Sequence, residues 1–215
     1  MTNINRDFIV DYVQGLTADR DISFQAMEAY ASENYVPIIE TELAQFLSVL
    51  VKIKKPRRIL EIGTAIGYSS LIMCDALDGN CKITTIEKDS SMAEMARENI
   101  IKMSYEDMIE VILGDGEDVI ETLTGDYDLI FIDASKGHYK SFFDKSVKLL
   151  SEEGIVVSDN VLFKGMIAND ELVNKRMKTI VKRLRAYLEY ITNLEGYTSS
   201  IIPIADGIAI TYKEV

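Results

Sequence analysis

Between residues 58 and 158 the chain alternates strand-length apolar segments with segments of helical pattern, and this alternation constrains the fold more than any other feature. We predict strands over residues 58–61, 82–87, 109–113, 127–132 and 155–158. Helices are predicted between them, over residues 68–77, 91–103, 117–123 and 139–150. Such alternation is typical of a doubly wound parallel sheet, so the expected fold class is α/β with a Rossmann-like core.

The two ends of the chain follow other patterns. Helices are predicted over residues 8–16, 22–34 and 37–53, with Pro37 in the first turn of the third, which gives an N-terminal helical extension. A long helix is predicted over residues 172–194. Strands at 199–204 and 208–212 then flank a short turn and predict an antiparallel C-terminal hairpin. We expect one domain over residues 1–215, with a helical cap at 1–55 and the core at 56–215.

Composition narrows the class of protein. The longest apolar stretches have strand length, so we expect no membrane span, and the N-terminus lacks the apolar core of a signal peptide. The two cysteines, Cys74 and Cys81, suit a reducing compartment, and we expect a cytoplasmic protein. A single histidine, His138, offers little for a zinc site or a histidine-based triad.

Oxygen ligands follow two of the predicted strands. Asp133 ends the run at 129–132, and Asp159 and Asn160 end the run at 155–158. Substrates gather at the carboxyl ends of parallel strands, and two carboxylates with a carboxamide suit Mg²⁺ or another hard divalent cation. The alternative is that these residues only cap helices or shape turns.

A candidate nucleotide site follows the first three strands. Gly63 and Gly67 form a glycine turn after the first strand, Glu87 ends the second, and Asp115 with Gly116 follows the third. The turn is neither a P-loop nor a complete dinucleotide fingerprint, and an acid after the second strand can accept ribose hydroxyls. This set favours an adenosine cofactor without a pyrophosphate, which S-adenosylmethionine (SAM) fits. The alternative for Glu87 is a surface acid.

Charge is unevenly distributed along the chain. The net charge is −12, which argues against a nucleic-acid partner, yet residues 52–58 hold five basic groups and no acid, and residues 175–185 hold six and no acid. These segments are either phosphate-binding patches or solvated faces. The candidate RNA-binding residues are Lys52, Lys54, Lys55, Lys164, Lys175, Arg176, Lys182 and Arg183.

Three stretches of sequence stand out together: LEIGTAIGYS at 60–69, FIDASK at 131–136 and SDN at 158–160. They resemble the metal-dependent class I O-methyltransferases of the catechol and caffeoyl-CoA type, and the resemblance covers essentially the whole chain in the same order. Residues 29–31, 36–40, 159–165 and 202–207 resemble more closely the bacterial tRNA 5-hydroxyuridine methyltransferases, which make 5-methoxyuridine at the wobble position.

The resemblance implies a role for each matched residue. Gly63, Ala65 and Ser69, with the Ile39 backbone nearby, would hold the methionine part of SAM; Glu87 would hold the ribose, and Asp115 and Gly116 would lie by the adenine. Asp133, Asp159 and Asn160 would bind Mg²⁺, with Asp133 also beside the cofactor, and Lys136 would be the general base.

These observations predict Mg²⁺-dependent methyl transfer from SAM. The first candidate acceptor is the 5-hydroxyl of 5-hydroxyuridine in the tRNA anticodon loop, and the second is a small catechol or phenol. The same active-site residues serve both, and only the basic segments favour RNA. A third hypothesis is a cofactor-binding or scaffold protein with a relic site. Apolar faces on the N-terminal helices also suggest a homodimer.

Overall fold

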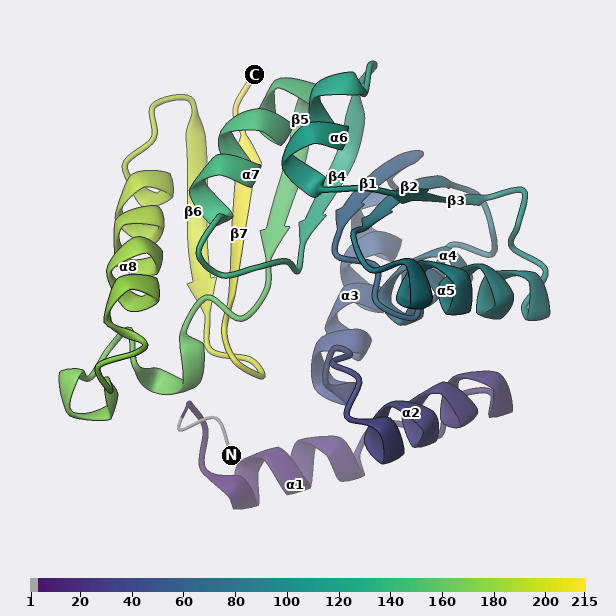
Figure 1. Ribbon diagram of the computed structural model, residues 1–215, viewed down its shortest axis with the longest axis horizontal. Helices are drawn as coiled ribbons and strands as arrows, with labels where there is room; N and C mark the ends of the chain where they lie inside the picture. The colour runs from purple at the N-terminus through teal and green to yellow at the C-terminus, as the bar shows by residue number, and fades with distance from the viewer. Residues whose placement is uncertain (1–3) are drawn as a thin grey trace.

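A seven-stranded sheet in the order β3-β2-β1-β4-β5-β7-β6 forms the centre of the computed structural model, which describes residues 4–215 (Figure 1). The first five strands are parallel, and β7 pairs antiparallel with both β5 and β6, as the sequence predicted. The strands are β1 (Arg58–Ile62), β2 (Lys82–Glu87), β3 (Ile109–Leu113), β4 (Tyr127–Ile132), β5 (Leu150–Ser158), β6 (Tyr197–Ile202) and β7 (Ile208–Lys213).

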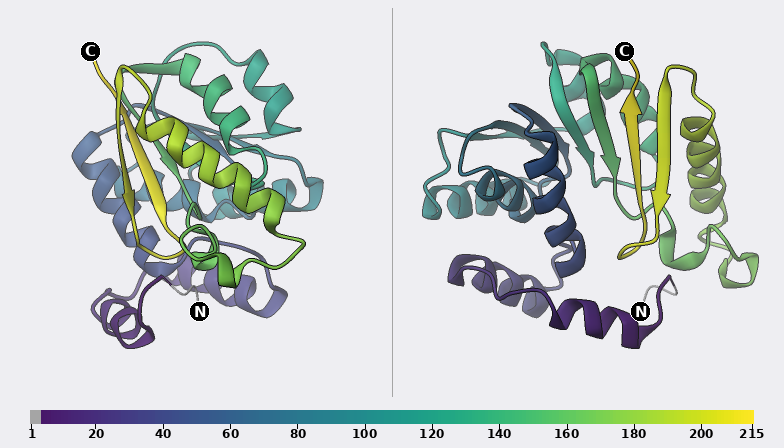
Figure 2. Two further views of the ribbon diagram at one scale, coloured as in Figure 1. Left: turned by 90° about the vertical axis from the view of Figure 1, so that its left-hand side faces the viewer. Right: turned by 180° about the vertical axis from the view of Figure 1, so that it is seen from behind.

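Helices cover both faces of this sheet (Figure 2). They are α1 (Asp7–Gly15), α2 (Ile22–Asn34), α3 (Thr41–Lys54), α4 (Tyr68–Ala76), α5 (Ser90–Lys102), α6 (Gly116–Thr122), α7 (Tyr139–Ser146) and α8 (Lys178–Thr192). Short 3₁₀ turns lie at Val147–Leu149, Phe163–Gly165 and Asp170–Leu172. Within residues 4–215, no helix is both long enough and apolar enough to cross a bilayer.

Two apolar cores lie on opposite faces of the sheet. Along β4, Leu129 and Phe131 pack into the core beneath α2 to α5, whereas Ile130 and Ile132 pack into the core beneath α6 to α8. This alternation follows from the two-residue period of a strand. Helix α3 contributes fully buried residues to the first core, so most of its apolar face belongs to the body of the protein.

The order of the strands reverses beside β1, where β2 lies on one side and β4 on the other. In open α/β sheets the ligand crevice forms at such a point, outside the carboxyl ends of the strands. Helices α1 and α2 run past this edge, at the bottom of Figure 1. The side chain of Asn5 fastens the N-terminal segment there by donating to the carbonyl oxygen of Pro203 at 2.7 Å.

Two predicted helices begin later than expected. The segment from Pro37 is not helical, because Glu40 has extended backbone angles and α3 starts at Thr41. The helix predicted from residue 172 starts at Lys178, because the Asn174 side chain accepts the N–H groups of Arg176 and Met177. An asparagine that binds nearby backbone in this way competes with the helix.

Candidate active site

A cavity of about 730 Å³ opens at the carboxyl edge of the sheet, where the switch in strand order predicts one. The sequence-predicted residues that line this cavity are Gly63, Ala65, Glu87, Asp115, Gly116, Asp133, Lys136 and Asn160. Segments separated by nearly 100 residues therefore meet at one place. Pro37, His138 and Phe142 also line the cavity, and sequence reasoning did not anticipate Pro37 and Phe142 there.

Gly63 joins the two sides of the cavity. It has a φ of +105°, and a Cβ atom at this position would lie 1.9 Å from the carbonyl oxygen of Asp133. Only glycine fits so close to another backbone segment. The glycine turn therefore brings β1 into contact with the strand that carries Asp133, and it leaves the N-terminus of α4 open for a ligand.

Glu87 and Asp115 are fixed by backbone N–H groups. Glu87 accepts the N–H of Ala65 at 2.8 Å with one oxygen and the N–H groups of Lys88 and Asp89 with the other. Asp115 caps α6 by accepting the N–H of Glu117 at 2.9 Å. A carboxylate has about four acceptor positions, so both groups keep capacity for a ligand. The turn-shaping and ligand-binding interpretations of these acids are thus compatible.

Two predicted cofactor residues do not line the cavity. Ile39 is buried in the apolar core, and Ser69 donates to the carboxylate of Glu61. Glu61 itself was missed: it is fully buried and also accepts hydroxyl hydrogen bonds from Ser70 and Thr85. Burial raises the pKa of Glu61 to about 7, although the three hydroxyl donors oppose this shift. Its place in the middle of a strand gave no signal beyond a polar residue in an apolar run.

The three candidate metal ligands lie together. The Asn160 amide lies 3.3 Å from Oδ1 of Asp133, and Asp159 accepts the N–H of Asn160 at 2.6 Å. Oδ2 of Asp159 is buried and has no hydrogen-bond partner among the described residues. Burial raises the pKa of Asp133 to about 6 and the pKa of Asp159 well above its ordinary value. Glu40 adds to both shifts, Asp133 adds to that of Asp159, and Lys136 opposes both.

This arrangement fits a hard divalent cation. A buried carboxylate oxygen without a partner is costly unless a proton or a cation compensates it. The oxygen-rich donor set suits Mg²⁺ or Ca²⁺. No three His, Cys, Asp or Glu side chains converge on a metal-binding arrangement within residues 4–215, and the candidate set combines two carboxylates with a carboxamide instead.

Lys136 lies between an aromatic ring and a carboxylate. Its Nζ is 4.9 Å from the centre of the Phe163 ring and 3.5 Å from Oδ2 of Asp206. Glu40, from the N-terminal segment, is close enough to Asp133 and Asp159 to raise their pKa values. Sequence reasoning assigned no role to Glu40 or Asp206, because each lies far from the other ligands along the chain.

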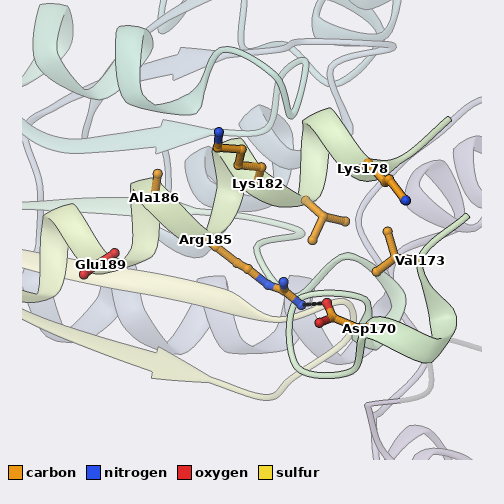
Figure 3. Close-up of a pocket in the computed structure, with 8 residues that line it drawn as sticks. Asp170, Val173, Lys178, Lys182, Arg185, Ala186 and Glu189 are labelled. Carbon is orange, nitrogen blue, oxygen red and sulfur yellow. Dashed lines mark hydrogen bonds and ion pairs between the residues drawn. The ribbon is translucent and has the colours of Figure 1, made fainter. Parts of the chain in front are cut away.

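The second basic segment borders the active site. Nη1 of Arg183 donates to the carbonyl oxygen of Gly137 at 3.3 Å, next to Lys136, and Arg185 donates to the carbonyls of Met166 and Ile167. Arg185 pairs with Asp170 at 2.7 Å in a groove of about 680 Å³. Figure 3 shows this pair, with Lys178 and Lys182 on the same helix. Lys175 and Arg176 are also exposed.

The first basic segment lies elsewhere. Lys52 and Lys54 end α3, and Lys55 follows it just before β1 begins, at the amino edge of the sheet. Lys54 donates to the carbonyl oxygen of Glu153 at 2.7 Å. The structure therefore does not bring Lys52, Lys54 and Lys55 together with the cavity, and only the residues around α8 and the loop with Lys164 lie near it.

Comparison with known proteins identifies the family. Residues 17–214 match the O-methyltransferase family model. A caffeoyl-CoA O-methyltransferase from Populus kitakamiensis is 31% identical over 185 residues, which cover 81% of this chain and 76% of the relative. A catechol O-methyltransferase from Niastella koreensis is 27% identical over 218 residues, which cover 98% of both chains.

A solved structure supports the same conclusion. The O-methyltransferase TomG from Streptomyces achromogenes, in complex with SAM, superposes with a TM-score of 0.83 at 26% identity and covers 95% of both chains. The chain belongs to the O-methyltransferase family. It is a SAM-dependent O-methyltransferase, and the predicted fold, enzyme class and SAM are confirmed.

Proposed function

We propose that this enzyme methylates an acidic ring hydroxyl, and that the acceptor is a small catechol or phenol. The observation that carries the proposal is the cluster of Asp133, Asp159 and Asn160, with its unpartnered buried oxygen, beside Lys136. The named relatives act on catechol and caffeoyl-CoA, which supports a phenolic acceptor.

Each group of residues would have a separate role in the reaction. A divalent cation held by Asp133, Asp159 and Asn160 would lower the pKa of the acceptor hydroxyl and orient its oxygen. Lys136 would take the hydroxyl proton on Nζ. Gly63 and Ala65 would leave room for SAM, whose methyl carbon is transferred to the oxygen as its bond to sulfur breaks, and Glu87 would hold the ribose. Asp115 and Gly116 would lie beside the adenine.

A second acceptor shares this chemistry: the 5-hydroxyl of 5-hydroxyuridine at the tRNA wobble position. The specific observation in its favour is an exposed basic surface, formed by Lys178 and Lys182 on α8 and by Lys175 and Arg176 in the turn just before it. Arg183, on the same helix, contacts the active-site loop. Such a surface fits a phosphate backbone. Lys164, in the loop after Asn160, would extend this surface, and the anticodon loop would then be the partner.

One experiment separates the two acceptors. Purified enzyme with Mg²⁺ and labelled SAM is incubated with catechol, with caffeoyl-CoA or with tRNA from a strain that lacks the gene for this enzyme. The products are identified by mass spectrometry. Methylated phenols with unchanged tRNA nucleosides support the first proposal. Conversion of 5-hydroxyuridine to 5-methoxyuridine, without turnover of the phenols, overturns it and supports the second.

A further inference from the structure

Asp206 is a buried carboxylate at the edge of the site, and neither the roles assigned from the sequence nor the proposed ligand set includes it. It lies in the turn between β6 and β7, and the residue is only 3% exposed. Burial raises its pKa, opposed by the Lys164 backbone and by Lys136. A buried acid of this kind is stable only with well-placed partners.

The turn that carries Asp206 is fastened to the loop after the metal ligands. The Asp206 carboxylate accepts the N–H of Lys164, and its carbonyl oxygen accepts the N–H of Leu162 at 3.0 Å. The Gly207 carbonyl oxygen accepts the N–H of Val161 at 2.8 Å, and a Cβ on Gly207 would lie 2.3 Å from Leu162. Because two of these bonds are between backbone atoms, they persist when the Asp206 side chain is changed.

The position of the Lys136 side chain depends on the Asp206 carboxylate, whereas backbone hydrogen bonds also hold the loop. Within residues 4–215, Asp206 supplies the only carboxylate in ion-pair contact with Nζ of Lys136, at 3.5 Å. The Lys136 side chain is about one quarter exposed, and its Nζ also lies near the Phe163 ring. The charges of Asp133, Glu40 and Asp159 interact with Lys136 without forming an ion-pair contact. A flexible lysine stem keeps one position only when its ammonium group is held.

We propose that Asp206 is a positioning residue, which holds the Lys136 amine beside the acceptor site without touching the reacting atoms. The inference rests on the proposed role of Lys136 as the proton acceptor. Asp206 and the Phe163 ring both lie close to Nζ, so the β6–β7 turn and the loop after Asn160 together support the base.

The first test does not need an acceptor. Competitive labelling of lysines with acetic anhydride, read by peptide mass spectrometry, compares wild type with Asp206→Asn. We expect Lys136 to label roughly threefold faster in the variant, because it loses its ionic partner in a half-buried position. The matched control is Asp144→Asn, which removes the ion pair of Lys140 at 2.6 Å and should accelerate Lys140 and leave Lys136 unchanged.

The second test measures transfer with two probes, catechol and 4-nitrocatechol. The nitro group makes one hydroxyl of nitrocatechol much more acidic than those of catechol, so its methylation needs less help from a base. With Asp206→Asn we expect the catechol kcat to fall by roughly tenfold or more, the nitrocatechol kcat to fall much less, and the dissociation constant of SAM to stay unchanged. A merely structural role would lower both rates equally.

The outcomes separate this inference from the proposed function. Unchanged Lys136 labelling in Asp206→Asn, or equal loss with both probes, overturns the positioning role. If wild type methylates neither probe, the phenolic proposal fails, and the labelling alone decides the inference. If Asp206→Asn lowers the unfolding midpoint by more than about 5 °C, Asp206→Glu replaces it, and wild-type labelling of Lys136 is then expected.

Discussion

The two halves of the active-site cavity are built in different ways. In the cofactor half, around β1, β2 and β3, the shape comes from backbone: the Gly63 turn, the Ala65 N–H bound by Glu87, and the start of α6 capped by Asp115. In the acceptor half, side chains from separate parts of the chain converge: Asp133 with Lys136, Asp159 with Asn160, Glu40 and Asp206.

The two halves of the site therefore depend on different physical properties. The cofactor half depends on conformations that only a few residues adopt, and its acids are bound by N–H groups. The acceptor half depends on buried charges that are mutually repulsive until a cation arrives. Substitutions in the two halves should therefore affect different measured quantities.

The largest effect is expected in the acceptor half. Asp159→Ala and Asp133→Ala should lower methyl transfer by roughly a thousandfold or more, because the acceptor hydroxyl is no longer ionised by a bound cation. Burial already disfavours both charges, so the unfolding midpoint without metal should stay equal or rise. Transfer from labelled SAM and thermal unfolding check this. A full rate for either variant in excess EDTA would contradict it.

Lys136→Met should have the next largest effect. Loss of a general base is expected to lower kcat by about a hundredfold while the affinity for SAM and for Mg²⁺ is kept. Stopped-time assays with saturating SAM measure the rate, and calorimetry measures both affinities. Lys140→Met, in the exposed ion pair on α7, is the control. Equal rates for the two variants would remove Lys136 from the mechanism.

Gly63→Ala tests the contact between the halves. The added Cβ would collide with the Asp133 carbonyl at 1.9 Å, and we expect a loss of about 3 kcal/mol in stability together with weaker binding of SAM. Gly196→Ala is the matched control, because Gly196 also has a positive φ but nothing lies within 4 Å of its Cβ. It should cost about 1 kcal/mol. Equal losses in chemical denaturation would mean that strain, and not the close contact, governs Gly63.

Glu87→Gln should change only the affinity for the cofactor. We expect SAM affinity to fall by roughly tenfold, since a charge-assisted bond to the ribose is weakened, with kcat at saturating SAM unchanged. The exposed Glu98 on α5 provides the control, Glu98→Gln. Calorimetric titration with S-adenosylhomocysteine measures both. A fall in kcat with unchanged affinity would place Glu87 in the acceptor half.

The buried acidic residues predict that pH changes the stability of the cation-free and the cation-bound enzyme differently. Burial raises the pKa of Asp133 to about 6 and of Glu61 to about 7, so the folded state binds protons more tightly than the unfolded state. Without metal, stability should fall as the pH rises from the ordinary pKa values of 3.8 and 4.5 to the raised values, and it should level off above about pH 7. With Mg²⁺ it should recover at pH 8 much more than at pH 5, because protons compete with the cation. Thermal unfolding with and without Mg²⁺ measures the difference, and a metal effect independent of pH would contradict it.

The sequence predicted the residues that follow regular strands and missed those that tertiary packing brings to the site. Gly63, Glu87 and Asp115 each follow one strand of a regular repeat, so their positions come from local pattern and the strand order. Glu40 and Asp206 reach the site through tertiary packing of the N-terminal segment and the C-terminal hairpin, which no local pattern encodes. The same is true of the extended segment after Pro37, where packing of Ile39 overrides a helical preference.

The smallest effect on a small acceptor is expected from the basic surface. Replacing Lys175, Arg176, Lys178 and Lys182 by Ala should leave catechol methylation within about twofold, and it should weaken any binding of tRNA and flatten its dependence on salt. Filter binding at several salt concentrations measures this. Lys52, Lys54 and Lys55, at the amino edge, form the matched control. If replacing these four residues leaves tRNA binding unchanged, tRNA is ruled out as the acceptor.

The proposed chemistry of the acceptor half requires a bound hard cation, and calorimetric titration tests this requirement directly. Mg²⁺ is added at pH 7.5 to metal-stripped wild type and to Asp159→Ala, both saturated with S-adenosylhomocysteine. We predict one binding site in wild type and no detectable binding in the variant. No binding to wild type, or the same affinity in both proteins, would contradict the account.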